Sequence, residues 1–159
     1  MAQYAHSAAG WTPIAHADGA TALANASYQA LRTTAASTLR VIEVMVSGEA
    51  TSSTVNRMAL RRLSTNGATP TNQVPAALNP LSAASVSQGY VAATTGPTIA
   101  STVHLLHLAL NTFGGVVRWV AAPGEEVYAT ASTAPTGEIV LDSISGTGVV
   151  STHMLFEEM

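Results

Sequence analysis

Histidine and acidic side chains are the first candidates for chemistry in this chain, which has five histidines and nine Asp or Glu residues. His104 and His107 are three positions apart, so their imidazoles could share a metal ion on a helix but project to opposite faces of a strand. The flanking Thr, Pro and Gly residues favour a strand over 103–110. We therefore expect no shared metal site, with one imidazole in solvent and the other at a polar rim. No motif surrounds the remaining histidines, His6, His16 and His153.

The sequence contains no arrangement of residues that is typical of nucleophilic or acid–base catalysis. A Ser–His–Asp site would have to use Asp18 or Asp142, and there is no Gly-x-Ser-x-Gly motif. Glu125 and Glu126 are adjacent in a turn, whereas the two carboxylates of a glycosidase lie on separate elements across a cleft. We predict a solvated pair there, and another at 157–158. The lack of Cys excludes thiol catalysis, thiolate metal sites and disulfides.

These observations predict a protein that is not an enzyme. We expect no catalytic, cofactor-binding or metal-binding residues, and no cofactor.

Three of the six basic residues, Arg57, Arg61 and Arg62, gather in one short stretch. If the strand that carries them pairs antiparallel with the strand that carries Glu43, this carboxylate comes near Arg57 or Arg61. We predict that ion pair, worth at most ~1 kcal/mol. The alternative is that the arginines meet a carboxylate of another subunit, because the planar guanidinium is favoured at interfaces.

Trp119 and Tyr128 flank a predicted tight turn at Pro123-Gly124, where Pro and Gly suit the second and third positions of a type II turn. We expect the two aromatic rings to share one face of the resulting hairpin and to pack in the core or between subunits. Stacking on a carbohydrate is the alternative.

The elements that must position these side chains are all predicted to be strands. Stretches rich in β-branched residues, or alternating with period two, are separated by Gly, Pro and Asn turn signals. We count about eight strands, over residues 24–32, 39–46, 55–63, 103–110, 116–120, 127–130, 138–144 and 149–156.

This pattern predicts an all-β fold, an antiparallel sandwich of jelly-roll type, with an irregular N-terminal arm. The length fits a single structural domain. Within it we expect residues 1–37 to form the arm and a first edge strand, and residues 38–159 to form the sandwich. The long loop at 64–87 is predicted to be functional or to lie against a partner.

The composition is poor in charge. Only 9% of the residues are charged, against ~25% in typical soluble domains, and 29 of the 159 residues are Ala. A net charge of −3, with no Lys, disfavours binding to nucleic acid. No apolar run is long enough for a membrane helix, and nothing resembles a secretory signal, so we expect a soluble protein made in a cytoplasm.

A surface of Ala, Ser and Thr associates readily, because little side-chain entropy or desolvation opposes contact. We therefore expect much of the chain to be buried in an oligomer or a larger assembly.

Short distinctive strings occur at 48–50, 55–57, 69–73, 78–80, 113–119, 122–126 and 155–158, the last reading Leu-Phe-Glu-Glu. Together they resemble small virion proteins of tailed bacteriophages. The resemblance, which covers roughly residues 39–159, implies a capsid decoration or cement protein. The resemblance implies a homo-oligomer, and more specifically a trimer, bound to the outer surface of the capsid. Its partner there would be the major capsid protein, with no nucleic acid or membrane as partner. The alternatives are a glycan- or receptor-binding module of a tail or fibre, and a small-molecule-binding or enzymatic jelly roll of the cupin type, which would need clustered His and Glu on adjacent strands.

Overall fold

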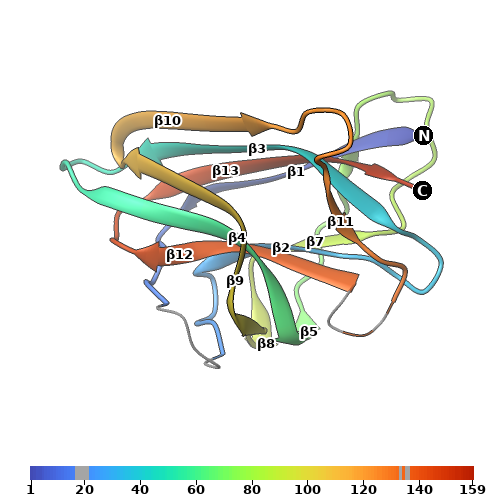
Figure 1. The fold of residues 1–159 in the computed structure, drawn as a ribbon, viewed down its shortest axis with the longest axis horizontal. Coiled ribbons are helices and arrows are strands. Elements are labelled where there is room, and N and C mark those ends of the chain that lie inside the picture. The colour runs from blue at the N-terminus through green and yellow to red at the C-terminus, as the bar shows by residue number, and fades with distance from the viewer. Residues whose placement is uncertain (17–21, 133, 135–136) are drawn as a thin grey trace.

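The computed structural model describes residues 1–16, 22–132, 134 and 137–159, and it contains no α-helix among them. Two antiparallel sheets pack face to face (Figure 1). Sheet A has the order β10-β3-β13-β1-β6, and β11 also pairs with β3. Its strands are β1 (Ala2–Trp11), β3 (Leu39–Glu49), β6 (Ala76–Ala77), β10 (Phe113–Val120), β11 (Val127–Ala129) and β13 (Val150–Glu158).

Sheet B has the order β7-β2-β12-β4-β9, and a small separate ribbon pairs β5 with β8. The strands of sheet B are β2 (Tyr28–Arg32), β4 (Val55–Thr65), β7 (Gln88–Tyr90), β9 (Thr98–Asn111) and β12 (Glu138–Ser145). The ribbon consists of β5 (Ala68–Pro70) and β8 (Ala93–Thr95). No helix that could cross a membrane occurs in the described part of the chain.

The strand order is that of a jelly roll. The longer strands form two groups of four, β1-β13-β3-β10 and β2-β12-β4-β9, so that β1 and β2, β3 and β4, and β12 and β13 lie in opposite sheets. The predicted all-β antiparallel sandwich is therefore confirmed.

The N-terminal segment differs from the prediction. Residues 2–11 form β1, which lies between β13 and β6, and irregular chain begins only after Trp11. The buried side chains of β1 are those of Tyr4, His6, Ala8 and Trp11. Because His6 is polar and the less buried positions include Ala5 and Ala9, apolar and polar residues do not alternate clearly in the sequence. The next predicted strand, 24–32, is shorter in the structure, and β2 lies inside sheet B between β7 and β12 rather than at an edge.

Two predicted hairpins are absent. β3 and β4 belong to different sheets, because the chain at 50–54 crosses from one sheet to the other. β10 and β11 both pair with β3 instead of with each other. The local sequence pattern shows where strands lie, but which strands pair with each other depends on packing between segments that are distant in the sequence.

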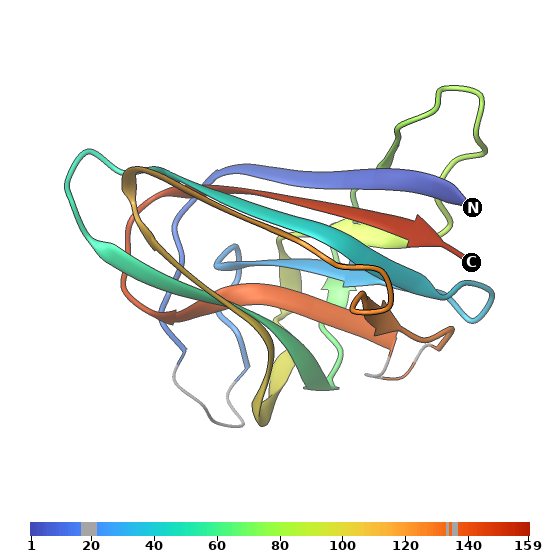
Figure 2. The ribbon, with the colours of Figure 1, turned by 45° about the horizontal axis from the view of Figure 1, so that its top comes forward.

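The main core lies between the sheets and includes Leu31, Val41, Leu60 and Phe156. The ring of Phe156 stacks on Tyr4 with 5.8 Å between centroids. A second, smaller core lies on the outer side of sheet B, where residues around Leu23 and the segment around β8 cover it. There Leu23 is buried, and its N–H donates to the Pro97 carbonyl at 2.9 Å. The protein thus seals most of the outer face of sheet B with its own chain, whereas the outer face of sheet A is open (Figure 2).

The predicted long loop contains the short strands β5 and β6, and its tip rises beside both chain termini (Figure 2). The Glu158 carboxylate accepts hydrogen bonds from the Ser85 hydroxyl and from the backbone N–H of Val86 and Ser87. The loop is therefore fixed in place although Leu81, at its tip, is 92% exposed.

Candidate functional site

The open outer face of sheet A is the candidate functional site. Antiparallel register aligns its outward side chains in rows across four strands. One such row contains Ala5, Leu155, Glu43 and Val120. A neighbouring row contains Ser7, His153, Met45 and Arg118. Small, apolar and polar side chains alternate over this face, so it offers a broad contact surface.

Two ion pairs lie on the open face, where the Glu49 carboxylate also accepts a hydrogen bond from the Ser151 hydroxyl. The Arg118 guanidinium donates two hydrogen bonds of 2.7 Å to the two carboxylate oxygens of Glu43. Arg40 Nε donates to Glu157 Oε2 at 2.8 Å, and Gln3 Nε2 donates to Glu157 Oε1 at 2.9 Å. Hydrogen bonds from Arg118 lower the pKa of Glu43, and those from Gln3 and Arg40 lower the pKa of Glu157. A partner can therefore cover these two ion pairs without having to neutralise a lone charge.

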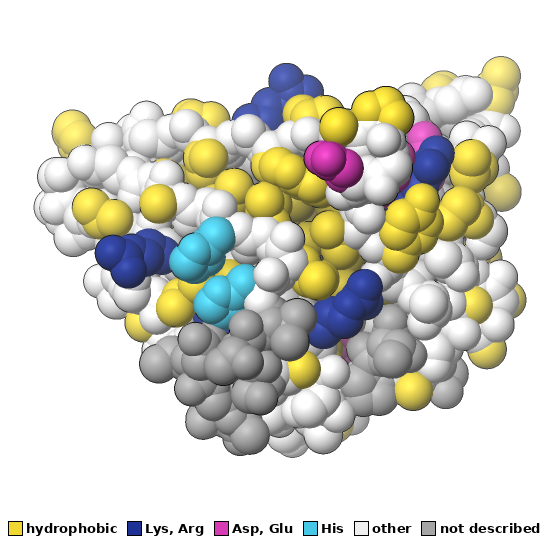
Figure 3. Space-filling view, in the orientation of Figure 1, with side chains coloured by type: hydrophobic (Ala, Val, Ile, Leu, Met, Phe, Trp, Pro, Cys, Tyr) yellow, Lys and Arg dark blue, Asp and Glu magenta, His cyan; other side chains and the backbone are white. Residues whose placement is uncertain are grey.

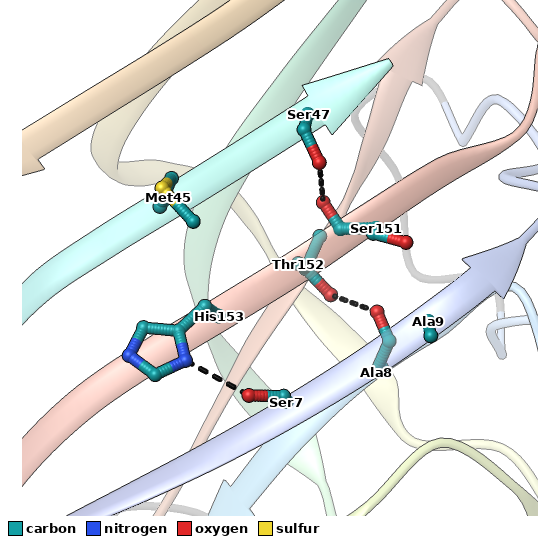
Figure 4. A pocket seen from close by; sticks show the side chains of 8 residues that line it. All are labelled: Ser7, Ala8, Ala9, Met45, Ser47, Ser151, Thr152 and His153. Atoms are coloured by element: carbon teal, nitrogen blue, oxygen red, sulfur yellow. Dashed lines mark hydrogen bonds between the residues drawn. The ribbon is translucent and has the colours of Figure 1, made fainter. Parts of the chain in front are cut away.

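A shallow hollow of about 220 Å³ lies in the open face, over β1, β13 and β3 (Figure 4). A β-bulge between Ala8 and Trp11 shifts the register of β1, and the side chains around the hollow are small. Met45 and His153 are its two large lining side chains, and His153 Nδ1 shares a 2.8 Å hydrogen bond with the Ser7 hydroxyl. The hollow offers hydroxyl groups, an imidazole and a thioether to a small polar or methyl group.

The prediction that His104 and His107 project to opposite faces of the strand is wrong. Their rings stack with centroids 5.0 Å apart. The register of β9 shifts beside them, because Leu60 pairs with Leu106 and the next residue of β4, Arg61, pairs with His104. This bulge turns both rings to the same side. Within the described residues, no group of three or more His, Asp or Glu is placed to hold a metal ion.

The predicted pairing of Glu43 with Arg57 or Arg61 is wrong, because β3 and β4 lie in different sheets. Glu43 binds Arg118 instead. Arg61 and Asp142 form a completely buried ion pair, with Arg61 Nε 3.0 Å from Asp142 Oδ1. This pair lies on the sealed face of sheet B, and Arg61 Nη2 also donates to the His16 carbonyl at 2.9 Å. Asp142 is thus part of a structural ion pair, and Asp18 lies outside the described residues.

A second buried cluster on the sealed face was not predicted. Arg32 Nε donates to Glu138 Oε2 at 2.6 Å, and the Tyr90 hydroxyl donates to the other oxygen of this carboxylate. Burial, only partly offset by the Arg32 hydrogen bond, raises the pKa of Glu138 to about 7. Burial, with a smaller contribution from Glu138, also raises the pKa of Tyr28 to about 12. Finding this cluster from sequence would require the register of β12 against β2, which no local pattern supplies.

Most of the other histidine, aromatic and acidic residues considered from the sequence pack or form hydrogen bonds within the fold. His6 is buried, and its burial, assisted by His153, lowers its pKa to about 4. Trp119 packs against the main core, whereas Tyr128, although on the neighbouring β11, is exposed. The prediction that the two rings share a face is therefore wrong.

Residue 125 is exposed, as predicted, but the acidic residues at 126, 157 and 158, also predicted to be solvated, are bound. Arg40 binds Glu126 and Glu157, and the long loop binds Glu158.

No protein-family model matches this chain, and no curated protein and no solved structure matches it.

Proposed function

We propose that this protein is a structural component of a tailed-bacteriophage virion, a decoration or cement protein that binds the outer surface of the capsid as a homo-oligomer. Its partners would be further copies of itself and the major capsid protein. The observation that carries the proposal is the difference between the two outer faces of the sandwich. The chain itself covers most of one face, and it leaves the other face open with two ion pairs on it.

The jelly-roll strand order supports this role, since the architecture recurs in viral capsid domains. Fold alone does not determine function, and the open face adds an argument about the site. A cement protein needs a broad surface rather than a reacting centre. Because only the folded protein binds the shell, binding also stabilises its fold by mass action.

Imaging of intact virions tests the proposal by locating the protein and counting its copies. Hundreds of copies spread over the shell would support a cement function. A few copies at a vertex or on the tail, or no copies at all, would contradict it.

A rebinding experiment tests which face is used. Virions stripped of the protein should break open at a lower temperature, and adding the protein back should restore the original temperature. Leu155→Arg, in the open face, should abolish rebinding. Ala109→Arg, at an exposed position of β9 in sheet B, is the matched control and should rebind like the natural protein. Equal rebinding of both variants would contradict the use of the open face.

The hollow at Ser7 and His153 favours one alternative, a glycan-binding module of a tail or fibre. Hydroxyl and imidazole groups around a shallow depression suit hydrogen bonding to a sugar. Binding of the isolated protein to a glycan array, lost in Ser151→Trp, would favour this alternative over the decoration function.

A further inference from the structure

Two of the four edges of the two sheets are too short to pair with another chain, because β6 has two residues and β7 has three. The register of β9 against β4 shifts at three places in its first half. Its second half, residues 106–111, is in unbroken register, but the exposed side chains there are the polar or small ones of His107, Ala109 and Asn111. The part of β1 that β6 leaves uncovered is bent by its bulge. Short and bulged edges are ordinary protection against sheet extension.

The fourth edge, β10, carries no such protection between Val116 and Val120. Over these residues it is in unbroken register with β3 and contains no Pro, and its one charged residue, Arg118, is held by Glu43 of β3. Val116 and Val120 are 65% and 54% exposed. Val117 and Trp119, on the other side of the strand, are only partly buried against the core. Figure 3 shows hydrophobic side chains gathered over β10 and between the edges of the two sheets.

The backbone of β10 is oriented to extend the sheet. Ala121 N–H, just past the strand, donates to the Ile42 carbonyl of β3 at 2.9 Å. Peptide groups alternate in direction along a strand, so those of Val116, Arg118 and Val120 point away from β3. They form the hydrogen-bonding row that a further antiparallel strand would need.

We propose that the occupant of this edge is β10 of a second copy of the chain, paired antiparallel about a twofold axis at Arg118. In this register Val116 faces Val120 of the second copy, and Val117 faces Trp119 of the second copy. Apolar side chains therefore meet on both faces of the extended sheet. Because the pairing is isologous, it uses the free edge of each copy and stops at a dimer.

The charges at the axis are compensated within each copy, so they do not oppose pairing in this register. The two Arg118 side chains lie opposite each other at the axis, which would be repulsive if they were alone. Each guanidinium is held by both oxygens of its own Glu43, on the inner neighbouring strand β3. The axis is thus surrounded by two positive and two negative charges, and the guanidinium groups are drawn back from the edge.

This inference goes beyond the proposed function, because it holds whether or not the protein is part of a virion. It differs from the trimer that the resemblance to decoration proteins implies. Sedimentation equilibrium at micromolar concentration should give a dimer for the natural protein. The doubly substituted Val116→Lys/Val120→Lys should be a monomer, and Leu81→Lys, at an exposed position of the long loop, should remain a dimer. A natural protein that is monomeric or trimeric would overturn the twofold pairing, even if virion imaging supports the decoration function.

The charges at the twofold axis can be tested separately. Glu43→Gln leaves two uncompensated arginines at the axis and should weaken dimerisation about fivefold at low salt, with the difference shrinking at high salt. Glu157→Gln, which removes the partner of Arg40 on the same face, is the control and should dimerise normally. An equal effect of both substitutions, or of neither, would overturn this register.

Hydrogen exchange separates edge pairing from loss of fold. The amides of Arg118 and Val120 should exchange slowly in the natural dimer and fast in Val116→Lys/Val120→Lys. The amides of β12 should stay protected in both proteins if the variant is folded. Fast exchange at Arg118 and Val120 in the natural dimer would show that another surface makes the contact and would overturn the inference.

Discussion

Both outer faces of this sandwich carry an Arg–Glu ion pair, but the pKa of the glutamate is shifted in opposite directions on the two faces. On sheet B, Glu138 is sealed under the chain with Arg32, and its pKa is raised by burial. On sheet A, Glu43 is held by Arg118 at the open surface, and its pKa is lowered by that contact. The ion pairs are chemically alike, and the covering segment makes the difference. The sealed pairs are buried within the fold, whereas the open pairs lie at the surface and neutralise their own charges there.

The sharpest contrast between the faces comes from removing one arginine from each. Arg61→Met leaves Asp142 buried without its counter-ion and should lower the free energy of unfolding by about 3–5 kcal/mol. Arg118→Met, on the open face, should change it very little, because exposed ion pairs add little to stability. Urea unfolding of both variants measures the difference. Similar losses for the two variants would refute the division into a sealed and an open face.

The pH dependence of stability should also come from buried groups. Since the pKa of Glu138 is raised from 4.5 to about 7, folding favours its protonated form, and stability falls as pH rises between these values. The pKa of His6 is lowered from 6.5 to about 4, so its contribution falls as pH decreases through this range. The two slopes oppose each other between pH 4.5 and 6.5. Each amounts to roughly 3 kcal/mol over its full range.

Single variants separate these contributions. Glu138→Gln should become more stable as pH rises from 4.5 to 6.5, because only the His6 slope remains. His6→Asn should become less stable over the same range. Urea unfolding at several pH values measures both slopes, and Glu43→Gln on the open face serves as the reference. Parallel pH profiles for Glu138→Gln and His6→Asn would refute the assignment.

A smaller effect is expected from loosening the seal of sheet B. A side chain at Gly96 would collide with the backbone of Leu23, whose hydrogen bond to the Pro97 carbonyl holds the chain around Leu23 on the outer side of sheet B. Gly96→Ala should therefore destabilise the fold by about 1–3 kcal/mol and speed hydrogen exchange in β12. Thr94→Ala, at an exposed position of β8, is the control. Unchanged exchange in β12 would show that the covering segment is not fixed at this contact.

The strands with large β-branched side chains were predictable from sequence, whereas their partners were not. The alternation at 55–63 and the apolar runs at 39–46 and 138–144 locate β4, β3 and β12, because each buries a full apolar face. β1 was missed because His6 and Ala8 lie between its buried aromatic residues and Ala occupies outward positions, so no clear alternation is visible. Pairing depends on contacts between distant segments, and no short window contains that information.

The candidate site was less predictable than the fold. Composition correctly drew attention to an unusually uncharged surface, but it could not locate the open face, which follows from the register of four strands. The histidine prediction was wrong because a single bulge in β9 reverses the side on which a residue lies. Buried ion pairs such as Arg61 with Asp142 likewise arise from pairing across strands that are distant in sequence.

Hydroxyl-radical footprinting of the free protein and of intact virions tests the central claim most directly. Met45 lines the hollow of the open face, and His107 is exposed on the outer side of sheet B. The account predicts that Met45 and Leu155 are oxidised in the free protein and protected in the virion, while oxidation of His107 stays the same. Protection of His107 with Met45 still oxidised in the virion would contradict it.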